Sequence, residues 1–323
     1  MIERSEGTTG PLRVVFMGTP EFAIPSLAAT VDAGHDLRLV VTTPPRRAGR
    51  GRSVRRSPID LFAEDRGLVV ATPESLKDPV FLRQVVDCEP DIICVVAFRI
   101  LPPELYEIPK LGSFNLHGSL LPRYRGAAPI NRAIMAGDTT TGVTTFFLKR
   151  RVDTGGIILQ RTMSIGPTMN AGELHDEMMV LGAAAVVDTL TLVGDGLTEG
   201  DPQDDSEATP APKIGPADLS IDWRRPASEI ANQVRGLSPR WGGLTMYGSE
   251  RWKIFSFRQL DEPRELPPGE LLTVGDHLFV GTGDGTLEII ELQREGKRRM
   301  DAAPLLRGFS GGLAGCFTDP DPE

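Results

Sequence analysis

The sequence predicts an open, mostly parallel α/β sheet of the Rossmann-like kind, followed by a small β-barrel. Three observations lead to this prediction. Apolar runs that suit buried strands alternate with helical segments over roughly the first 200 residues. The stretch from 194 to 210 then holds six acidic residues, no basic ones, and several glycines and prolines. After Lys213, short strand-like segments follow one another with turn signals between them.

The first strand is expected at Leu12–Met17, a compact apolar run that ends at Gly18. Thr19 and Pro20 then predict the N-cap and the first residue of a helix that runs to about Ala33. A capped helix explains this turn better than a phosphate-binding loop, since no GxGxxG motif is present. Further strands are expected at 37–42, 68–70, 91–97, 113–116, 143–148 and 157–165, and further helices at 58–66, 78–86, 128–137 and 172–193.

The C-terminal part contains five expected strands, at 244–247, 252–257, 270–274, 277–280 and 287–292. Five short strands favour a small barrel similar to the oligonucleotide-binding (OB) type. The expected organisation is a tail at 1–10, an α/β domain at 11–193, a linker at 194–212, a barrel at 213–315 and a tail at 316–323.

The composition is that of a globular protein and gives no signal for a membrane span, a disulfide framework or a zinc site. The 323 residues are 40% hydrophobic and 24% charged, which is typical of a globular protein. The longest strongly apolar stretch, about 92–98, is far short of the ~20 residues that span a bilayer. The three cysteines form no CxxC, and none of the four histidines pairs with a cysteine or histidine at ligand spacing. We therefore expect a cytoplasmic monomer with no metal and no membrane contact.

Charge is unevenly distributed. The net charge is −9, yet six arginines and no acids lie between Arg46 and Arg56. A concentrated basic loop on an acidic protein is a local electrostatic feature. Such a loop can reach phosphates, and it can equally be a solvated loop.

The densest chemical signal is the run from Asn115 to Pro129. Asn115 and His117 are two residues apart at a strand end, so their side chains point the same way. Asp153 follows another expected strand. An amide and a protonated imidazole can donate to the oxyanion of an acyl transfer, while the carboxylate orients the ring or accepts a proton. The alternative is a core histidine beside a turn asparagine.

The run FNLHGSLLPRYRGAAPINRAI, with DTGGIIL downstream, resembles the signature of the folate-dependent formyltransferases. The segments RVVFMGTPEFAIPSL, AGRGR, IDW, IANQVRGLSP and GKRRM resemble the branch of that family that acts on methionyl-tRNA. The resemblance runs from about Leu12 to Phe309. It implies catalysis by Asn115, His117 and Asp153, with 10-formyltetrahydrofolate as formyl donor and initiator methionyl-tRNA as acceptor.

The resemblance also implies binding residues. Those for folate are Ser119, Leu120, Leu121, Pro122 and, packed on the pterin ring, Phe98. Those for tRNA are Arg46, Arg47, Arg50 and Arg52 in the basic loop, with Lys297 and Arg298 in the barrel. Two departures from the family pattern stand out. The segment Ala97–Pro102 is one residue short and lacks a glycine, and Asp60 stands where a lysine is usual.

Two alternatives remain open. The same chemistry could act on a sugar or nucleotide amine, although such enzymes are not expected to combine the arginine loop with a β-rich C-terminus. The chain could also be a non-catalytic tRNA-binding module that has kept the scaffold, which the intact Asn115, His117 and Asp153 argue against.

Overall fold

The computed structural model describes residues 10–48, 53–260, 265–309 and 312–320. The chain divides into two compact units. Unit 1 comprises Met1–Gly126, Thr141–Met163 and His175–Ala211, and unit 2 comprises Ala127–Thr140, Ser164–Leu174 and Pro212–Glu323. The domain boundaries expected from the sequence remain a prediction.

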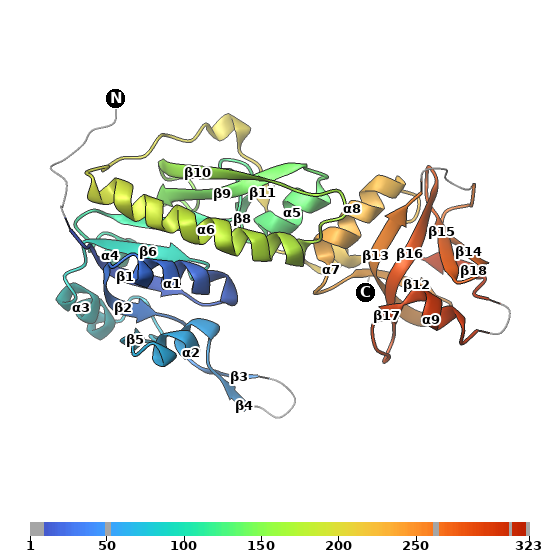
Figure 1. Cartoon of the computed structure of the whole chain (residues 1–323), viewed down its shortest axis with the longest axis horizontal. Coiled ribbons are helices and arrows are strands. Elements are labelled where there is room, and N and C mark those ends of the chain that lie inside the picture. The colour runs from blue at the N-terminus through green and yellow to red at the C-terminus, as the bar shows by residue number, and fades with distance from the viewer. Residues whose placement is uncertain (1–9, 49–52, 261–264, 310–311, 321–323) are drawn as a thin grey trace. The chain divides into compact units, whose positions relative to one another are not determined.

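Unit 1 is built on a seven-stranded sheet in the order β10-β9-β7-β6-β1-β2-β5 (Figure 1). The pairs among β5, β2, β1, β6 and β7 are parallel, whereas β9 runs antiparallel to β7. The expected open, mostly parallel sheet is therefore confirmed. The strands are β1 (Arg13–Gly18), β2 (Asp36–Val41), β5 (Val70–Ala71), β6 (Ile92–Val96), β7 (Ser113–His117), β9 (Thr140–Phe147) and β10 (Ile157–Ser164).

Helices connect these strands, and their starts follow from local sequence. Ser57 caps α2 by accepting from the Asp60 N–H at 3.0 Å, and Asp78 caps α3 by accepting from the Val80 N–H at 2.9 Å. The helices that connect or flank the strands are α1 (Ile24–Asp32), α2 (Pro58–Asp65), α3 (Pro79–Asp87), α4 (Pro103–Tyr106) and α6 (Ala171–Gly194).

The expected cap at Thr19 was wrong. A short 3-10 helix, η1 (Glu21–Ala23), precedes α1, and its N-cap residue is Pro20. The buried Thr19 hydroxyl has no hydrogen-bond partner among the described residues. The chain therefore makes a tight turn here before the α-helix begins.

The two faces of the sheet carry separate apolar layers. Val15, Ile93 and Val95 pack with residues of α3 and α4 in one core cluster. On the other face Leu116 meets α6, where a Cβ on Gly182 would lie 2.7 Å from the leucine side chain. Because side chains alternate along a strand and Val95 pairs with Asn115, Asn115 lies on the same face as Val95.

Helix α6 matches the helix expected at 172–193 to within one residue at each end, and it is rich in apolar residues. Its 24 residues are long and apolar enough to cross a membrane, judged by length and composition alone. A core helix of a globular protein passes the same test. Met178, Val186, Leu190 and Val193 of this helix are buried, and the Thr189 hydroxyl bonds that of Thr145 on β9 at 2.7 Å. These contacts make α6 a layer on the sheet.

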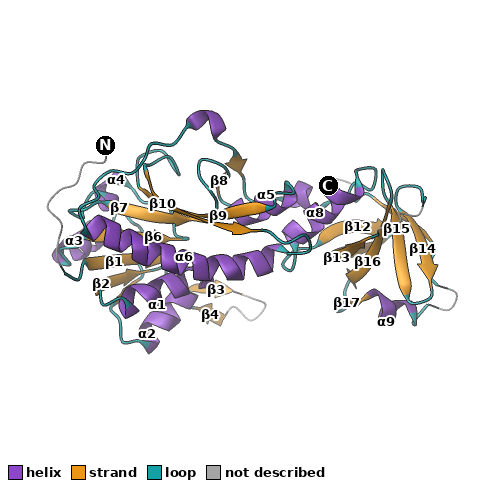
Figure 2. Ribbon diagram, turned by 45° about the horizontal axis from the view of Figure 1, so that its top comes forward, coloured by secondary structure: helices purple, strands orange, loops and turns teal. Residues whose placement is uncertain are grey.

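Unit 2 contains a closed antiparallel barrel (Figure 2). Six strands follow in the order β13-β12-β18-β14-β15-β16, and the pairing of β13 with β16 closes the ring. The expected barrel is confirmed, with one strand more than the five expected. The strands are β12 (Gly243–Tyr247), β13 (Glu250–Gln259), β14 (Glu270–Val274), β15 (His277–Gly281), β16 (Thr286–Arg294) and β18 (Gly315–Thr318), and β17 (Met300–Asp301) pairs with β16.

Aromatic packing explains why β18 closes the barrel, although its residues fall mostly in the stretch expected to be a tail. Phe317 on β18 is 2% exposed and stacks on Trp223 with ring centroids 5.6 Å apart. It also meets Trp252 and Tyr247 edge-on. The helices of unit 2 are α5 (Pro129–Met135), α7 (Pro216–Leu219), α8 (Ala227–Leu237) and α9 (Ala302–Leu306).

Two stretches expected to be irregular contain regular elements. The arginine loop forms a hairpin of β3 (Arg46–Ala48) and β4 (Ser53–Arg55). The acidic stretch after α6 contains the 3-10 helix η2 (Asp205–Glu207) and the short strand β11 (Pro210–Ala211). Strand β11 pairs in parallel with β8 (Arg125–Gly126), a pairing that no local sequence pattern signals.

Candidate active site

The run singled out by its chemistry lies at the carboxyl end of β7. Asn115 and His117 are the third and fifth residues of this strand. They share a face of the sheet, because a strand turns alternate side chains to the same side. The carboxyl edge is where open parallel sheets bind ligands, since the loops there diverge and leave backbone groups free.

His117 is fixed through one ring nitrogen. The side chain is buried, and its Nε2 lies 2.8 Å from the Tyr124 carbonyl oxygen. A carbonyl oxygen can only accept, so Nε2 carries a hydrogen and donates it. The other ring nitrogen, Nδ1, is therefore the atom that can gain or lose a proton in the site.

Asp153 faces that second nitrogen. Its Oδ2 atom lies 3.9 Å from His117 Nδ1, and its side chain is 11% exposed. The same oxygen accepts from the Gly126 N–H at 3.0 Å. The loop between β9 and β10 thus places the Asp153 carboxylate beside the end of β7. Of the three residues that the sequence predicts to meet, His117 and Asp153 are close to each other in the structure.

Both partners of His117 have left-handed backbones. Tyr124 has φ of 61° and Asp153 has φ of 55°. Each such non-glycine residue costs on the order of 1–3 kcal/mol, and it persists only where its surroundings hold it in place. The neighbours that fix these two residues therefore matter to the site.

Asn115 supplies an amide that is not used in internal hydrogen bonding. The residue is half-buried, and its side chain bonds no other residue in the described parts of the chain. A side-chain amide offers two donors and one acceptor. At a strand end beside an imidazole and a carboxylate, those donors suit an oxygen that gains negative charge.

The expected folate-binding segment, Ser119–Pro122, follows directly. The Leu121 N–H donates to the Thr144 hydroxyl at 3.0 Å, and the Leu121 carbonyl accepts from Gln160 at 2.8 Å. Ser119 is buried, and its hydroxyl donates to the Arg123 carbonyl at 2.6 Å. Because these backbone groups are already hydrogen-bonded, a ligand here would contact mainly the partly exposed side chains of Leu120 and Pro122. The assignment of the segment to folate remains a prediction.

The shortened segment Ala97–Pro102 has its own anchoring. Ala97 has φ of 49°, and the Arg99 guanidinium donates to the carbonyls of Pro73 and Glu74 at 2.9 and 3.0 Å. Phe98 is half-buried and packs against the α3 and α4 layer, with the Arg99 guanidinium over its ring. Its expected contact with a pterin ring remains a prediction.

The expected tRNA-binding residues are spread over the chain. Arg46 is exposed on β3, and Arg47 follows it in the hairpin, whereas Arg50 and Arg52 lie outside the described residues. Burial, and then the positive charge of Arg46, lower the pKa of Arg99. The hairpin therefore brings positive charge to the segment that carries Phe98. Lys297 and Arg298 are exposed between β16 and β17.

Not every arginine of the basic loop is available. Arg56 donates to Asp60 at 2.6 and 2.7 Å and forms an ion pair with Glu64 at 2.5 Å. Asp60 stands where the resemblance implies a lysine, and it binds Arg56, one of the six arginines of the loop. Arg56 belongs to the start of α2 and not to a free basic surface.

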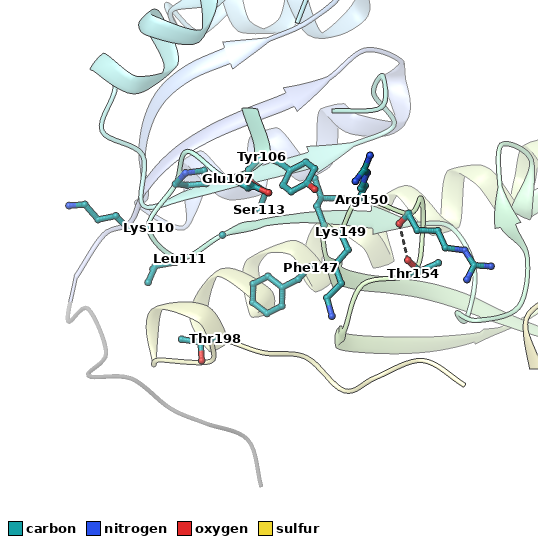
Figure 3. Close-up of a pocket in the computed structure, with 14 residues that line it drawn as sticks. Tyr106, Glu107, Lys110, Leu111, Ser113, Phe147, Lys149, Arg150, Thr154 and Thr198 are labelled. Carbon is teal, nitrogen blue, oxygen red and sulfur yellow. Dashed lines mark hydrogen bonds between the residues drawn. The ribbon is translucent and has the colours of Figure 1, made fainter. Parts of the chain in front are cut away.

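A separate hollow of about 740 Å³ opens near the other end of β7 (Figure 3). Its lining includes the apolar or aromatic Tyr106, Leu111 and Phe147 and the basic Lys110, Lys149, Arg150 and Arg151. Thr154, whose hydroxyl donates to the Arg151 carbonyl at 2.8 Å, is the neighbour of Asp153. Asn115, His117 and Asp153 do not line this hollow. Within the residues that the structure describes, no group of three metal-ligating side chains occurs.

Sequence reasoning missed several residues of the site. Tyr124 and Gly126 contact the candidate pair through backbone atoms, which carry no residue-type signal. Gln203 contacts the Asp153 loop from about 50 positions away along the chain. Its stretch reads as a linker, so only the folded structure reveals this contact.

Comparison with known proteins places these features in a family. The formyl transferase model matches residues 12–190, and the model of the formyl transferase C-terminal domain matches residues 213–310. The methionyl-tRNA formyltransferase of Chlorobium luteolum is 46% identical over 304 residues, covering 92% of this chain and 97% of that protein. That of Moorella thermoacetica is 43% identical over 310 residues, covering 94% and 100%.

Solved structures share the fold at lower identity. An N-formyltransferase of Helicobacter canadensis, in complex with folinic acid and dTDP-3-aminofucose, gives a TM-score of 0.67 at 19% identity, covering 90% of this chain and 100% of that one. HypX from Aquifex aeolicus, in complex with tetrahydrofolic acid, gives 0.64 at 16% identity, covering 92% and 47%.

Proposed function

Because this chain belongs to the formyl transferase family, we propose that it moves a formyl group from 10-formyltetrahydrofolate to the α-amino group of methionyl-tRNA. Relatives of 40–46% identity over most of the chain carry the name methionyl-tRNA formyltransferase. The product would be formylmethionyl-tRNA, which serves translation initiation in the cytoplasm. The expectation of a monomer, without membrane contact or metal, remains a prediction.

The observation that best supports this chemistry is that His117 and Asp153 lie close together at the end of β7, the strand that also contains Asn115. His117 Nδ1 lies 3.9 Å from the Asp153 carboxylate, while Nε2 is committed to the Tyr124 carbonyl. A protonated His117 would thus direct Nδ1–H into the site, where it and the Asn115 amide can donate to the oxygen of the attacked formyl group. Removing one such donor typically costs roughly 10²- to 10³-fold in rate.

Asp153 has two parts in this scheme. Its carboxylate faces Nδ1 of His117 and can hold the imidazole ring in place. It can also accept the proton that the attacking amine loses as the new C–N bond forms. The tetrahydrofolate nitrogen then leaves with the electron pair of the old C–N bond and takes up a proton. None of these steps requires a nucleophile from the protein.

The acceptor amine is the point on which the alternatives differ. A sugar formyltransferase shares the fold at 19% identity, whereas the methionyl-tRNA relatives are 40–46% identical. The arginine-bearing hairpin, with exposed Arg46, suits a polyanion, because each phosphate contact adds salt-dependent affinity. Both observations favour tRNA over a sugar or nucleotide amine.

The proposal is tested by transfer of labelled formyl from 10-formyltetrahydrofolate. The acceptors are methionyl-tRNA, uncharged tRNA, a dTDP-linked amino sugar and phosphoribosylglycinamide, each with and without the reduced folate. We expect label only on methionyl-tRNA, and only with the donor. Label on the sugar or nucleotide amine alone would replace the proposed acceptor. No transfer to any amine, without folate binding, would favour a non-catalytic tRNA-binding module.

A further inference from the structure

The acidic stretch after α6 is part of unit 1 and forms hydrogen bonds with other segments of that unit. We call residues 200–211 the strap. Figure 1 shows this part of the chain running back along unit 1 after the end of α6. Its composition suggests a flexible linker, yet it forms defined hydrogen bonds to the two loops that hold the partners of His117.

Both ends of the strap are attached by backbone pairing at positions that need glycine. At one end Asp201 and Ile157 exchange two backbone hydrogen bonds of 2.7 and 2.8 Å. A Cβ on the adjacent Gly200 would lie 2.5 Å from the backbone of Gly156. At the other end β11 pairs with β8, and a Cβ on Gly126 would lie 2.6 Å from the Ala211 carbonyl. Neither end can accommodate a side chain there without moving.

Gln203 lies between these ends and uses both ends of its amide. The NH₂ group donates to the carbonyls of Asp153 and Gly155 at 3.0 and 2.9 Å. The oxygen accepts from two Arg125 nitrogens, Nη2 at 2.7 Å and Nε at 3.1 Å. One side chain therefore joins the loop that carries Asp153 to the loop that follows His117.

Neighbouring strap residues reinforce this link. Asp205 forms an ion pair with Arg125 at 2.7 Å, and a hydrogen bond from Arg125 lowers the pKa of Asp205. The Thr209 hydroxyl accepts from the Tyr124 N–H at 2.8 Å, and the Thr209 carbonyl accepts from the Arg125 N–H at 2.9 Å. The strap thus reaches both residues that hold left-handed backbones beside His117.

We propose that Gln203 is a positioning residue, which holds the Asp153 loop so that the carboxylate stays directed at Nδ1 of His117. This inference rests on the proposed formyl transfer. Asp153 has φ of 55°, a conformation that persists only where its surroundings hold it, and the hydrogen bonds from Gln203 to the carbonyls of Asp153 and Gly155 contribute to holding it. Displacement of a reacting group by about 1 Å can cost on the order of 10²-fold in rate.

The test separates the two ends of the Gln203 amide. Gln203→Leu removes both, whereas Gln203→Glu keeps an acceptor for Arg125 and removes the donors to Asp153 and Gly155. We expect kcat to fall by roughly 10- to 100-fold in both variants, with the KM for methionyl-tRNA little changed. Glu207→Gln is the control, because Glu207 is exposed on the same strap and bonds no side chain in the described parts of the chain. It should retain wild-type kcat.

Two further measurements distinguish positioning from general support. In an Asp153→Asn background, Gln203→Glu should have almost no additional effect, since the residue acts through Asp153. With ¹⁵N-labelled histidine, the ring resonances of His117 should move in Gln203→Glu and stay fixed in Glu207→Gln. The chain has only four histidines, so His117→Ala assigns the signals.

Several outcomes would overturn the inference. These are wild-type kcat in Gln203→Glu, an undiminished effect in the Asp153→Asn background, or unmoved His117 resonances. If Gln203→Leu fails to fold, the Gln203→Glu variant and its spectrum still decide. Failure of the proposed function gives a different result, because the wild-type protein itself would then transfer no formyl to methionyl-tRNA, while the resonances would still report the position of His117.

Discussion

His117 Nδ1 and Asp153 Oδ2 face each other at 3.9 Å, while the opposite ring nitrogen is 2.8 Å from the Tyr124 carbonyl oxygen. The carbonyl fixes which nitrogen carries the permanent hydrogen, and so assigns proton exchange to the nitrogen that faces the carboxylate. The separation exceeds a direct hydrogen bond, and such contacts commonly tighten when substrate enters.

Asn115→Ala should reduce kcat by roughly 10²- to 10³-fold, because the variant loses the amide donor proposed to stabilise the oxyanion. Its KM for either substrate should change little if the interaction forms only in the transition state. Steady-state kinetics with circular dichroism to verify folding would check this. A variant that lost affinity for folate but kept kcat would make Asn115 a binding residue instead.

Arg46→Ala should raise the KM for methionyl-tRNA by several-fold and flatten its salt dependence, since exposed arginines contribute through phosphate contacts. Arg56→Ala is the matched comparison, because Asp60 and Glu64 already bind that guanidinium. It should lower thermal stability and leave the KM for tRNA nearly unchanged. Equal effects of the two variants on KM would show that the whole loop acts as one basic surface.

Asp91, which directly precedes β6, binds Arg13 on β1, and this contact makes the stability of the fold depend on pH. Hydrogen bonds from Arg13 lower the pKa of Asp91 in the folded protein. The carboxylate therefore stabilises the fold above the ordinary aspartate pKa of about 3.9, and this contribution is lost as the pH falls toward the lower folded pKa. Asp91→Asn should lower the melting temperature by roughly 2–4 °C at pH 7. The difference from wild type should close below about pH 3.9; a gap that widened there would contradict this account.

Phe317→Ala should destabilise the barrel by about 3–5 kcal/mol, because it removes a buried ring from the aromatic cluster that closes the barrel. All three tryptophans, Trp223, Trp241 and Trp252, belong to unit 2, so denaturation followed by tryptophan fluorescence reports on that unit. Cys316→Ala on the same strand changes an exposed side chain and should have little effect. Similar curves for both variants would show that β18 is not needed for closure.

The parts of the site that sequence could predict are those with local signals. Asn115 and His117 end a buried apolar strand, and their spacing of two puts them on one face. Asp153 was identified from the DTGG motif. Gln203 could not be found in this way, because its contacts join residues 48 to 78 positions apart and the composition around it is typical of a linker. The interactions of Tyr124 and Gly126 pass through the backbone, which any residue type shares.

In the fold, too, elements with local sequence signals were predicted and elements that depend on long-range packing were not. The five expected barrel strands are present because each combines an apolar pattern with a turn signal, whereas β18 lacked such a pattern in its four residues. Helix α8 was missed although Ile230, Val234 and Leu237 are buried with helical spacing. Asn232 and Gly236, which lie between them, weaken its helical propensity, and packing against α5 and β13 supplies the stability that propensity does not.

The most direct test of the central claim is the single-turnover rate of formyl transfer to methionyl-tRNA, measured with Asp153→Asn at saturating donor. His175→Ala is the control, since His175 lies outside the site and pairs with Asp176. If the carboxylate supports His117 as described, the rate falls by at least about 10²-fold in Asp153→Asn and stays at the wild-type value in His175→Ala. A rate within about threefold of wild type in Asp153→Asn, with the protein folded, would contradict the account.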